Sequence, residues 1–269
     1  MKDFDYYLKK GLIVEEVQND LKAYAFDWDD NIQFLPTTIK LVNQNKKQVK
    51  EFSTSDFAIK RTDPKILELL NQGYEWDYGS FRWWSDEEFI SDALSSPVGP
   101  AWPDFVECIN NAYLFAIITA RGHNPNAYKK VIYKMIMSNK NGINKDEVVK
   151  NIKNFREAMG HKIDFPDKLL ITKYVNQCKY YPIMFPKVQE LLGTSGGNAA
   201  NPEKLKILAL KHFKQFTNKM HSLLIKKVGH KEISVGFSDD DQRNINAMEK
   251  AASEDDNIKD VNLKYTGPK

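Results

Sequence analysis

The sequence predicts an α/β fold in which a parallel β-sheet is covered by helices on both faces. Three short apolar runs, each followed by polar residues, are typical of buried strands; they occupy residues 23–28, 114–118 and 233–238. The run Leu114–Ile118 is too short for a helix and too continuous for a strand with one face in water. Segments with helical patterns separate the strands, and this alternation indicates a parallel sheet flanked by helices.

The composition is that of a globular protein. The chain has 269 residues, of which 42% are hydrophobic and 28% charged, so it is long enough to bury a sizeable core. No apolar run approaches the roughly 18 residues needed to cross a bilayer, and the N-terminal segment lacks the apolar stretch of a secretory signal. The net charge of +3 does not by itself indicate nucleic-acid binding. We expect a cytoplasmic protein in which Cys108 and Cys178 are buried, reduced thiols.

In the first part of the chain, an amphipathic helix over Ile13–Leu21 is expected before the strand Ala23–Trp28. Two β-prone runs, TTIKLV and QVKEF, flank a polar stretch and predict a β-hairpin. Four helices are then expected. The first passes through Asp56–Ala58 and is capped by Ser53 or Thr54, and the second covers Pro64–Leu70. The third begins at the capping box of Ser85 and Glu88 and continues through Leu94, and the fourth covers Asp104–Asn111.

In the second part, the strand Leu114–Ile118 is followed by helices over Asn126–Met137 and Lys145–Met159, and Gly160 ends the second of these. The remaining expected elements are the strand Lys179–Phe185, the helix Pro186–Leu192, a long helix starting near Glu203, the strand Ile233–Ser238, the helix Asn244–Ala252 and the edge strand Val261–Tyr265.

Polar, chemically capable residues follow each of the three buried strands. Asp27 and Asp29 follow the first, Thr119 and Arg121 the second, and Asp239 and Asp240 the third. Ligands of open parallel sheets bind beyond the carboxyl ends of the strands. Carboxylates that meet at one edge repel one another, and a divalent cation among them relieves the repulsion. Carboxylates, waters and a substrate phosphate are the ligands that Mg²⁺ prefers, so we expect a Mg²⁺ site at this edge.

Four segments in order resemble the motifs of the haloacid dehalogenase (HAD) superfamily. They are FDWDDNI at 26–32, IITAR at 117–121, a lysine at the start of the long helix, and GFSDDD at 236–241 with Asn244. The resemblance spans about residues 23–252, although only these short motifs match. It implies a Rossmann-like sheet with inserted cap regions. Asp30 and Asn31 depart from the pattern, because many members have Gly and Thr or Val at these positions.

The resemblance also implies roles for individual residues. Asp27 would be the nucleophile that forms an aspartyl-phosphate, and Asp29 would be the general acid and base. Mg²⁺ would be held by Asp27, the backbone carbonyl of Asp29 and Asp240, with Asp239 as a neighbouring support or water-mediated ligand.

Three further residues would act on the phosphate. Thr119 would bind it through its hydroxyl, and Arg121 would either bind phosphate or substrate or form a surface ion pair. The motif lysine is Lys206 or Lys204, and Lys206 is favoured because it follows Leu205 on the more apolar side of the helix.

The inserted segments suggest a division into a core and a cap. The core would comprise residues 1–53 and 104–269, with residues 54–103 forming a cap and a possible second insertion around residues 122–200. The hairpin Thr37–Phe52 would resemble the flap that covers HAD active sites. The aromatic tract Tyr74–Trp84 either forms the small core of the cap or stacks on a base or sugar of the substrate.

The best-supported function at this point is a Mg²⁺-dependent phosphatase of phosphomonoesters. The paired Asp27 and Asp29 favour phosphoryl chemistry over the dehalogenase branch, which lacks the second aspartate. We expect a phosphorylated small molecule as substrate, and a phosphorylated nucleic-acid end is a further option. A metal-dependent nuclease and a non-catalytic module that binds phosphorylated ligands are the alternatives.

Overall fold

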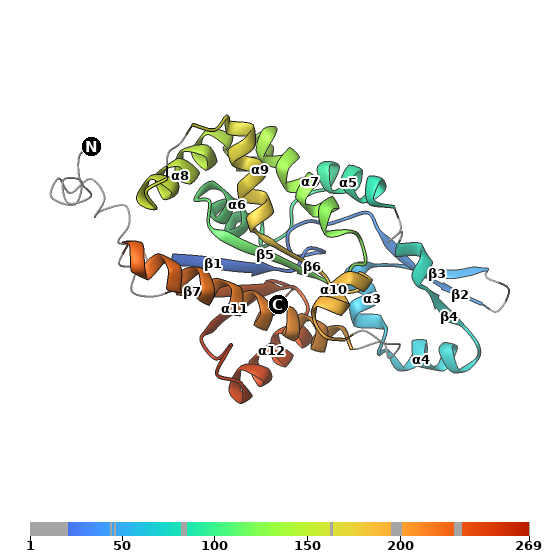
Figure 1. Ribbon diagram of the computed structural model, residues 1–269. Coiled ribbons are helices and arrows are strands. Elements are labelled where there is room, and N and C mark those ends of the chain that lie inside the picture. The colour runs from blue at the N-terminus through green and yellow to red at the C-terminus, as the bar shows by residue number, and fades with distance from the viewer. Residues whose placement is uncertain are drawn as a thin grey trace.

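The computed structural model describes residues 21–43, 45, 47–81, 85–161, 164–194, 201–228 and 233–268, and it confirms the predicted α/β fold (Figure 1). A five-stranded sheet has the order β6-β5-β1-β7-β8, and every neighbouring pair is parallel. Its strands are β1 (Leu21–Phe26), β5 (Leu114–Thr119), β6 (Lys179–Pro182), β7 (Ile233–Asp239) and β8 (Val261–Tyr265). The helix expected over Ile13–Leu21 lies outside the described residues, apart from Leu21, which begins β1.

The sheet is buried because its strands carry apolar side chains on both faces. Phe26, Phe115 and Ile117 pack into the core on one face, and Ala25 and Ile118 pack into the core on the other. Figure 1 shows helices on both sides of the sheet. Those of the first face are α5 (Asp86–Ser95), α6 (Trp102–Asn110), α7 (Pro125–Met137), α8 (Lys145–Ala158) and α9 (Asp167–Gln177), and those of the second are α10 (Pro186–Leu191), α11 (Pro202–Val228) and α12 (Gln242–Glu254). The arrangement is Rossmann-like.

A small lobe, residues 37–81, lies at the carboxyl end of the main sheet (Figure 1). It contains an antiparallel sheet of β2 (Thr38–Val42), β3 (Gln48–Ser53) and β4 (Glu75–Asp77), with α3 (Thr54–Lys60), α4 (Pro64–Asn71) and the 3₁₀ helix η1 (Tyr78–Phe81). The predicted hairpin is therefore confirmed. Its strand β2 also pairs with β4, so one sheet joins residues expected in the core to residues expected in the cap. The domain boundaries themselves stay a prediction.

Within the aromatic tract, Trp76 packs inside the small lobe. Its ring lies 5.4 Å from that of Phe52 and 4.9 Å from that of Phe57, both edge-on. Edge-to-face pairs at these separations stabilise a core. Of the two interpretations of the tract, the described contacts of Trp76 favour a small core over a surface that stacks on a ligand.

The capping residues in the sequence predicted most helix starts correctly. Ser53 accepts a hydrogen bond from the backbone N–H of Asp56, and Ser85 accepts one from Glu88, as the capping patterns predicted. The helix α9 was not predicted from the sequence. No side chain caps its first turn, and its Thr172, Tyr174 and Val175 are weak helix formers, so packing on α7 and α8 decides its conformation.

The expectation for the two cysteines is also met. Cys108 and Cys178 are both free and buried. Within the described part of the chain, no helix combines the length and the apolar character needed to cross a bilayer.

Phe105 on α6 is the centre of an aromatic cluster, so truncating it should destabilise the fold. Its ring is fully buried and lies 5.5 Å from Phe26 and 5.9 Å from Phe115. We expect Phe105→Ala to lower the free energy of unfolding by about 3–5 kcal/mol, measured by urea denaturation. Phe155→Ala on α8 is the control, since that side chain is 40% exposed and should cost within about 0.5 kcal/mol. Equal losses for the two variants would contradict this packing.

Candidate active site

The three strand ends singled out in the sequence meet at one edge of the sheet. In the ladder, Phe26 of β1 pairs with Ile117 of β5 and with Ser238 of β7. Asp27 follows Phe26 directly, and its backbone N–H donates to the Ser238 carbonyl at 3.0 Å. Parallel neighbours end at the same edge, so Asp27 lies between Thr119 and Asp239.

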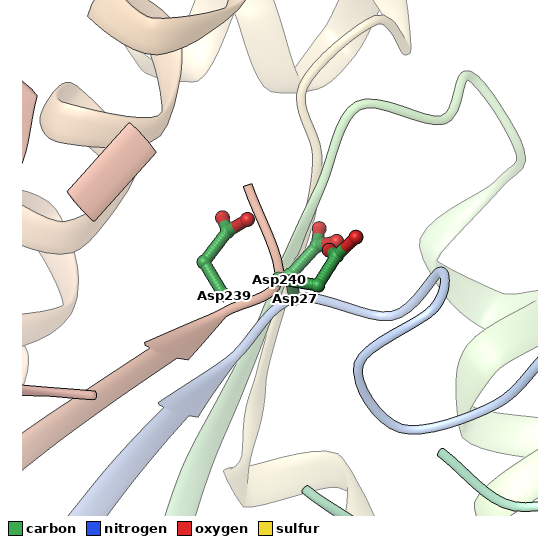
Figure 2. A group of neighbouring side chains, drawn as sticks. All are labelled: Asp27, Asp239 and Asp240. Atoms are coloured by element: carbon green, nitrogen blue, oxygen red, sulfur yellow. The ribbon is translucent and has the colours of Figure 1, made fainter. Parts of the chain in front are cut away.

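Three carboxylates form a cluster there, as Figure 2 shows. Asp27, Asp239 and Asp240 each offer an oxygen within 4.8 Å of the others. Asp27 is 5% exposed and Asp239 is fully buried. Burial raises the pKa of Asp27 well above its ordinary range, and Asp239 and Asp240 add to the rise against the opposing effect of Lys206. Burial and then Asp239 raise the pKa of Asp240 to about 8. The positive charge of Lys206 therefore does not offset the effect of burial and of the neighbouring acids on the pKa of Asp27 and Asp240.

Asp239 differs from the other two because protein donors already surround it. It accepts hydrogen bonds from Lys206 Nζ at 2.7 Å, from Asn244 Nδ2 at 3.0 Å and from the Asp241 backbone N–H at 2.9 Å. Three protein donors therefore already contact the Asp239 carboxylate. The geometry thus suits Asp239 to support the cluster, and Asp27 and Asp240 to contact a cation.

The structure brings Lys206, but not Lys204, into the cluster. Lys206 Nζ lies 3.0 Å from Asp27 Oδ1 and 2.7 Å from Asp239 Oδ2, and Lys206 is 3% exposed. Burial alone would lower the pKa of Lys206, but Asp239 and Asp27 together raise it. Lys204, two residues earlier on α11, is exposed.

Asp29 lies apart from the cluster and pairs with Arg121. Arg121 Nε donates to Asp29 Oδ2 at 2.8 Å, and its Nη2 donates to Asp29 Oδ1 at 2.6 Å. Burial lowers the pKa of Arg121, but the Asp29 carboxylate more than offsets this and raises it. Thr119 Oγ1 also donates to Asp29 Oδ2, at 3.5 Å. Arg121 is buried and Asp29 is partly buried, so this is not an ion pair between exposed side chains.

Two departures from the family pattern have structural roles that the sequence alone did not reveal. Asp30 has a φ of 56°, the left-handed region that favours glycine, and its carboxylate accepts a hydrogen bond from Thr54 of α3 at 2.5 Å. Asn31 is fully buried and donates to the carbonyls of Asp27 and Ser238 at 3.0 and 3.1 Å. The only sequence signal for these roles was their position directly after the strand.

The residues at this edge fit a hard divalent cation. Asp27 and Asp240 supply oxygen ligands, which Mg²⁺ prefers over nitrogen or sulfur. Their raised pKa values mark a place where added positive charge would stabilise the carboxylates. Whether the backbone carbonyl of Asp29 joins them, as expected from the sequence, stays a prediction.

The raised pKa of Asp240 gives a test in metal-free protein. The folded state holds a proton on Asp240 up to about pH 8, whereas the unfolded state releases it near the ordinary value of 3.8. The contribution of Asp240 to stability is therefore greatest at low pH and is lost as pH rises towards 8. With EDTA present, we expect the stability of Asp240→Asn relative to the wild type to increase from pH 5 to pH 9, measured by urea denaturation. If the cluster holds Mg²⁺, saturating Mg²⁺ should stabilise the wild type more than Asp240→Asn. A difference that does not change with pH would be the contrary result.

Comparison of the chain with protein-family models, with curated proteins and with solved structures finds no match. The function must therefore be inferred from the residues and geometry of the chain itself.

Proposed function

We propose that the protein is a Mg²⁺-dependent phosphatase that hydrolyses phosphomonoesters through an aspartyl-phosphate on Asp27, in the manner of the HAD superfamily. The observation that carries this proposal is the meeting of Asp27 and Asp240 with Lys206 at the carboxyl edge of the sheet. Asp27 stands at a buried strand end, and Asp29 stands two residues further on. A nucleophile, a cation site and a proton donor are the parts that this reaction requires.

The reaction has two steps. In the first, an Asp27 oxygen forms a bond to phosphorus, the bond from phosphorus to the leaving alkoxide breaks, and Asp29 gives the alkoxide a proton. In the second, a water oxygen forms a bond to phosphorus, Asp29 takes the proton of that water, and the bond to Asp27 breaks to release inorganic phosphate. Mg²⁺, held by Asp27 and Asp240, would screen the carboxylate from the anionic substrate and stabilise the charge on the phosphoryl group.

Three residues around Asp27 would assist. Lys206, with Nζ at 3.0 Å from Asp27 Oδ1, would orient the carboxylate for attack and opposes the rise in its pKa. Thr119 offers a hydroxyl beside Asp29 to a phosphate oxygen. Both oxygens of Asp29 accept from Arg121, so one oxygen has to leave the guanidinium before it can deliver a proton. The phosphoryl dianion of an incoming substrate would compete with Asp29 for Arg121 and so release that oxygen.

We propose a phosphorylated small molecule, with a phosphorylated nucleic-acid end as the second candidate, because the small lobe contacts the site through Thr37 and Thr54 and would cover a compact ligand. We also propose a cytoplasmic location, since the buried free thiols Cys108 and Cys178 fit a reducing compartment.

The nucleophile is tested by Asp27→Asn. We expect the variant to lose at least about a thousandfold in Mg²⁺-dependent release of phosphate from p-nitrophenyl phosphate, because the amide cannot form the aspartyl-phosphate. Asp256→Asn, an exposed aspartate after α12, is the matched control and should retain wild-type activity. Equal rates for Asp27→Asn and wild type would exclude this mechanism. Plasmid nicking that survives Asp27→Asn but not Asp240→Asn would favour the nuclease instead.

The proton donor is tested by the identity of the leaving group. An alkoxide needs a proton to leave, whereas p-nitrophenolate does not. We therefore expect Asp29→Asn to reduce kcat/KM for a phosphorylated alkyl alcohol at least about tenfold more than for p-nitrophenyl phosphate. Steady-state assays on both substrates measure the ratio. A uniform loss on the two substrates would assign Asp29 a role other than proton donation.

A further inference from the structure

The C-terminal segment Tyr265–Pro268 reaches the carboxylate cluster, although it lies beyond all four motifs. It follows the edge strand β8, which pairs with β7 so that Tyr265 is the ladder partner of Asp239. The next backbone N–H, that of Thr266, donates to the Asp239 carbonyl at 3.0 Å. After β8 ends, the chain therefore stays hydrogen-bonded to the backbone at Asp239.

Thr266 also sets the orientation of the buried Asn31 amide. The Asn31 NH₂ group faces three acceptors, namely the carbonyls of Asp27 and Ser238 and the Ser238 hydroxyl, at 3.0–3.1 Å. The amide oxygen then points the opposite way and needs a donor, and Thr266 Oγ1 supplies it at 2.6 Å. Through Asn31, one hydroxyl near the C-terminus thus helps link the end of β1 to the end of β7.

Gly267 packs directly against the backbone of Asp240. A Cβ atom at this position would lie 2.3 Å from the Asp240 carbonyl oxygen and 2.5 Å from the Tyr265 hydroxyl oxygen. Those distances are far below van der Waals contact, so only glycine fits without movement of the neighbours. The Tyr265 hydroxyl in turn donates to the Pro268 carbonyl at 2.8 Å, which closes the segment on itself.

We propose that this segment positions the metal-binding carboxylates, with Thr266 as the positioning residue that fixes the spacing of Asp27 and Asp240. Asp27, Asp239 and Asp240 repel one another and move apart unless their backbones are held. Thr266 holds β1 through Asn31 and holds β7 through the Asp239 carbonyl. A site whose ligands are already held at the distance that the cation needs binds it more tightly, because the ligands lose less conformational entropy on binding. The inference rests on the Mg²⁺ site of the proposed function.

The test compares Thr266→Val, which keeps the shape and removes the hydroxyl, with Thr266→Ser, which keeps the hydroxyl. Binding of Mg²⁺ and Mn²⁺ to the full chain is measured by isothermal titration calorimetry, without substrate. We expect Thr266→Val to weaken the affinity for the metal about tenfold, as loss of a supporting contact around a metal site does, and Thr266→Ser to restore it to within about twofold. Thr172→Val on α9 is the matched control, because that exposed hydroxyl donates to the Lys168 carbonyl of its own helix and, among the residues that the structure describes, to no other group.

Gly267→Ala is the second variant; it keeps the Thr266 hydroxyl group and adds a Cβ that clashes with the Asp240 carbonyl and the Tyr265 ring. It should also weaken metal binding, so the inference stays testable if Thr266→Val does not fold. Metal affinities equal to that of the wild type in both folded variants would overturn the proposal, even if their Tm falls. A wild-type protein that binds neither metal would overturn it too.

The proposed function can fail separately. Metal binding that depends on Thr266, in a protein that releases no phosphate from any ester, would support the positioning role and refute the phosphatase. Metal-dependent phosphate release whose metal affinity is the same in both variants as in the wild type would support the phosphatase and refute the positioning role.

Discussion

The site depends on the ion pairs of one buried ammonium group. Lys206 Nζ lies between Asp27 and Asp239, at 3.0 and 2.7 Å, and all three residues are at most 5% exposed. Carboxylates that leave water at adjacent strand ends are costly unless they are paired. Leu205, Ala209 and Leu210 of α11 pack into the core beneath the sheet and hold the lysine in place. The packing of this helix therefore sets the charge balance at the sheet edge.

One ammonium group compensates only part of the negative charge. The pKa of Asp27 stays well above its ordinary range despite Lys206, and that of Asp240 rises to about 8. Asp239, in contrast, is held by donors from Lys206, Asn244 and the Asp241 backbone. The hydrogen bonds thus distinguish Asp239, which is surrounded by protein donors, from Asp27 and Asp240, whose charged forms a further cation would stabilise. This division is the physical argument for a divalent ion between Asp27 and Asp240, and it does not depend on the motifs.

Local patterns in the sequence predicted the sheet and the residues at its edge, because buried parallel strands are short apolar runs and their carboxyl ends meet. They could not predict α9, whose Thr172, Tyr174 and Val175 are held helical by tertiary contacts. Nor could they choose decisively between Lys204 and Lys206, because the direction of each side chain depends on how α11 packs. Nor could they predict the donor to the Asn31 amide oxygen, because Thr266 lies 235 residues away in the chain.

The same hydrogen bonds indicate how the small lobe would influence the chemistry. Thr37, just before β2, accepts from the Arg121 guanidinium that holds Asp29, and Thr54 of α3 donates to Asp30. Arg61, at the end of α3, pairs with Glu203 in the first turn of the helix that carries Lys206, at 2.7 Å. The lobe therefore contacts the core next to Asp29, the loop that follows Asp27 and the helix that carries Lys206. Asp30 supplies one of these contacts through its side chain. A ligand that changed the position of the lobe would act on Asp29 through Thr37 and Arg121. In the proposed phosphatase reaction, recognition of the leaving group and delivery of its proton would then be coupled.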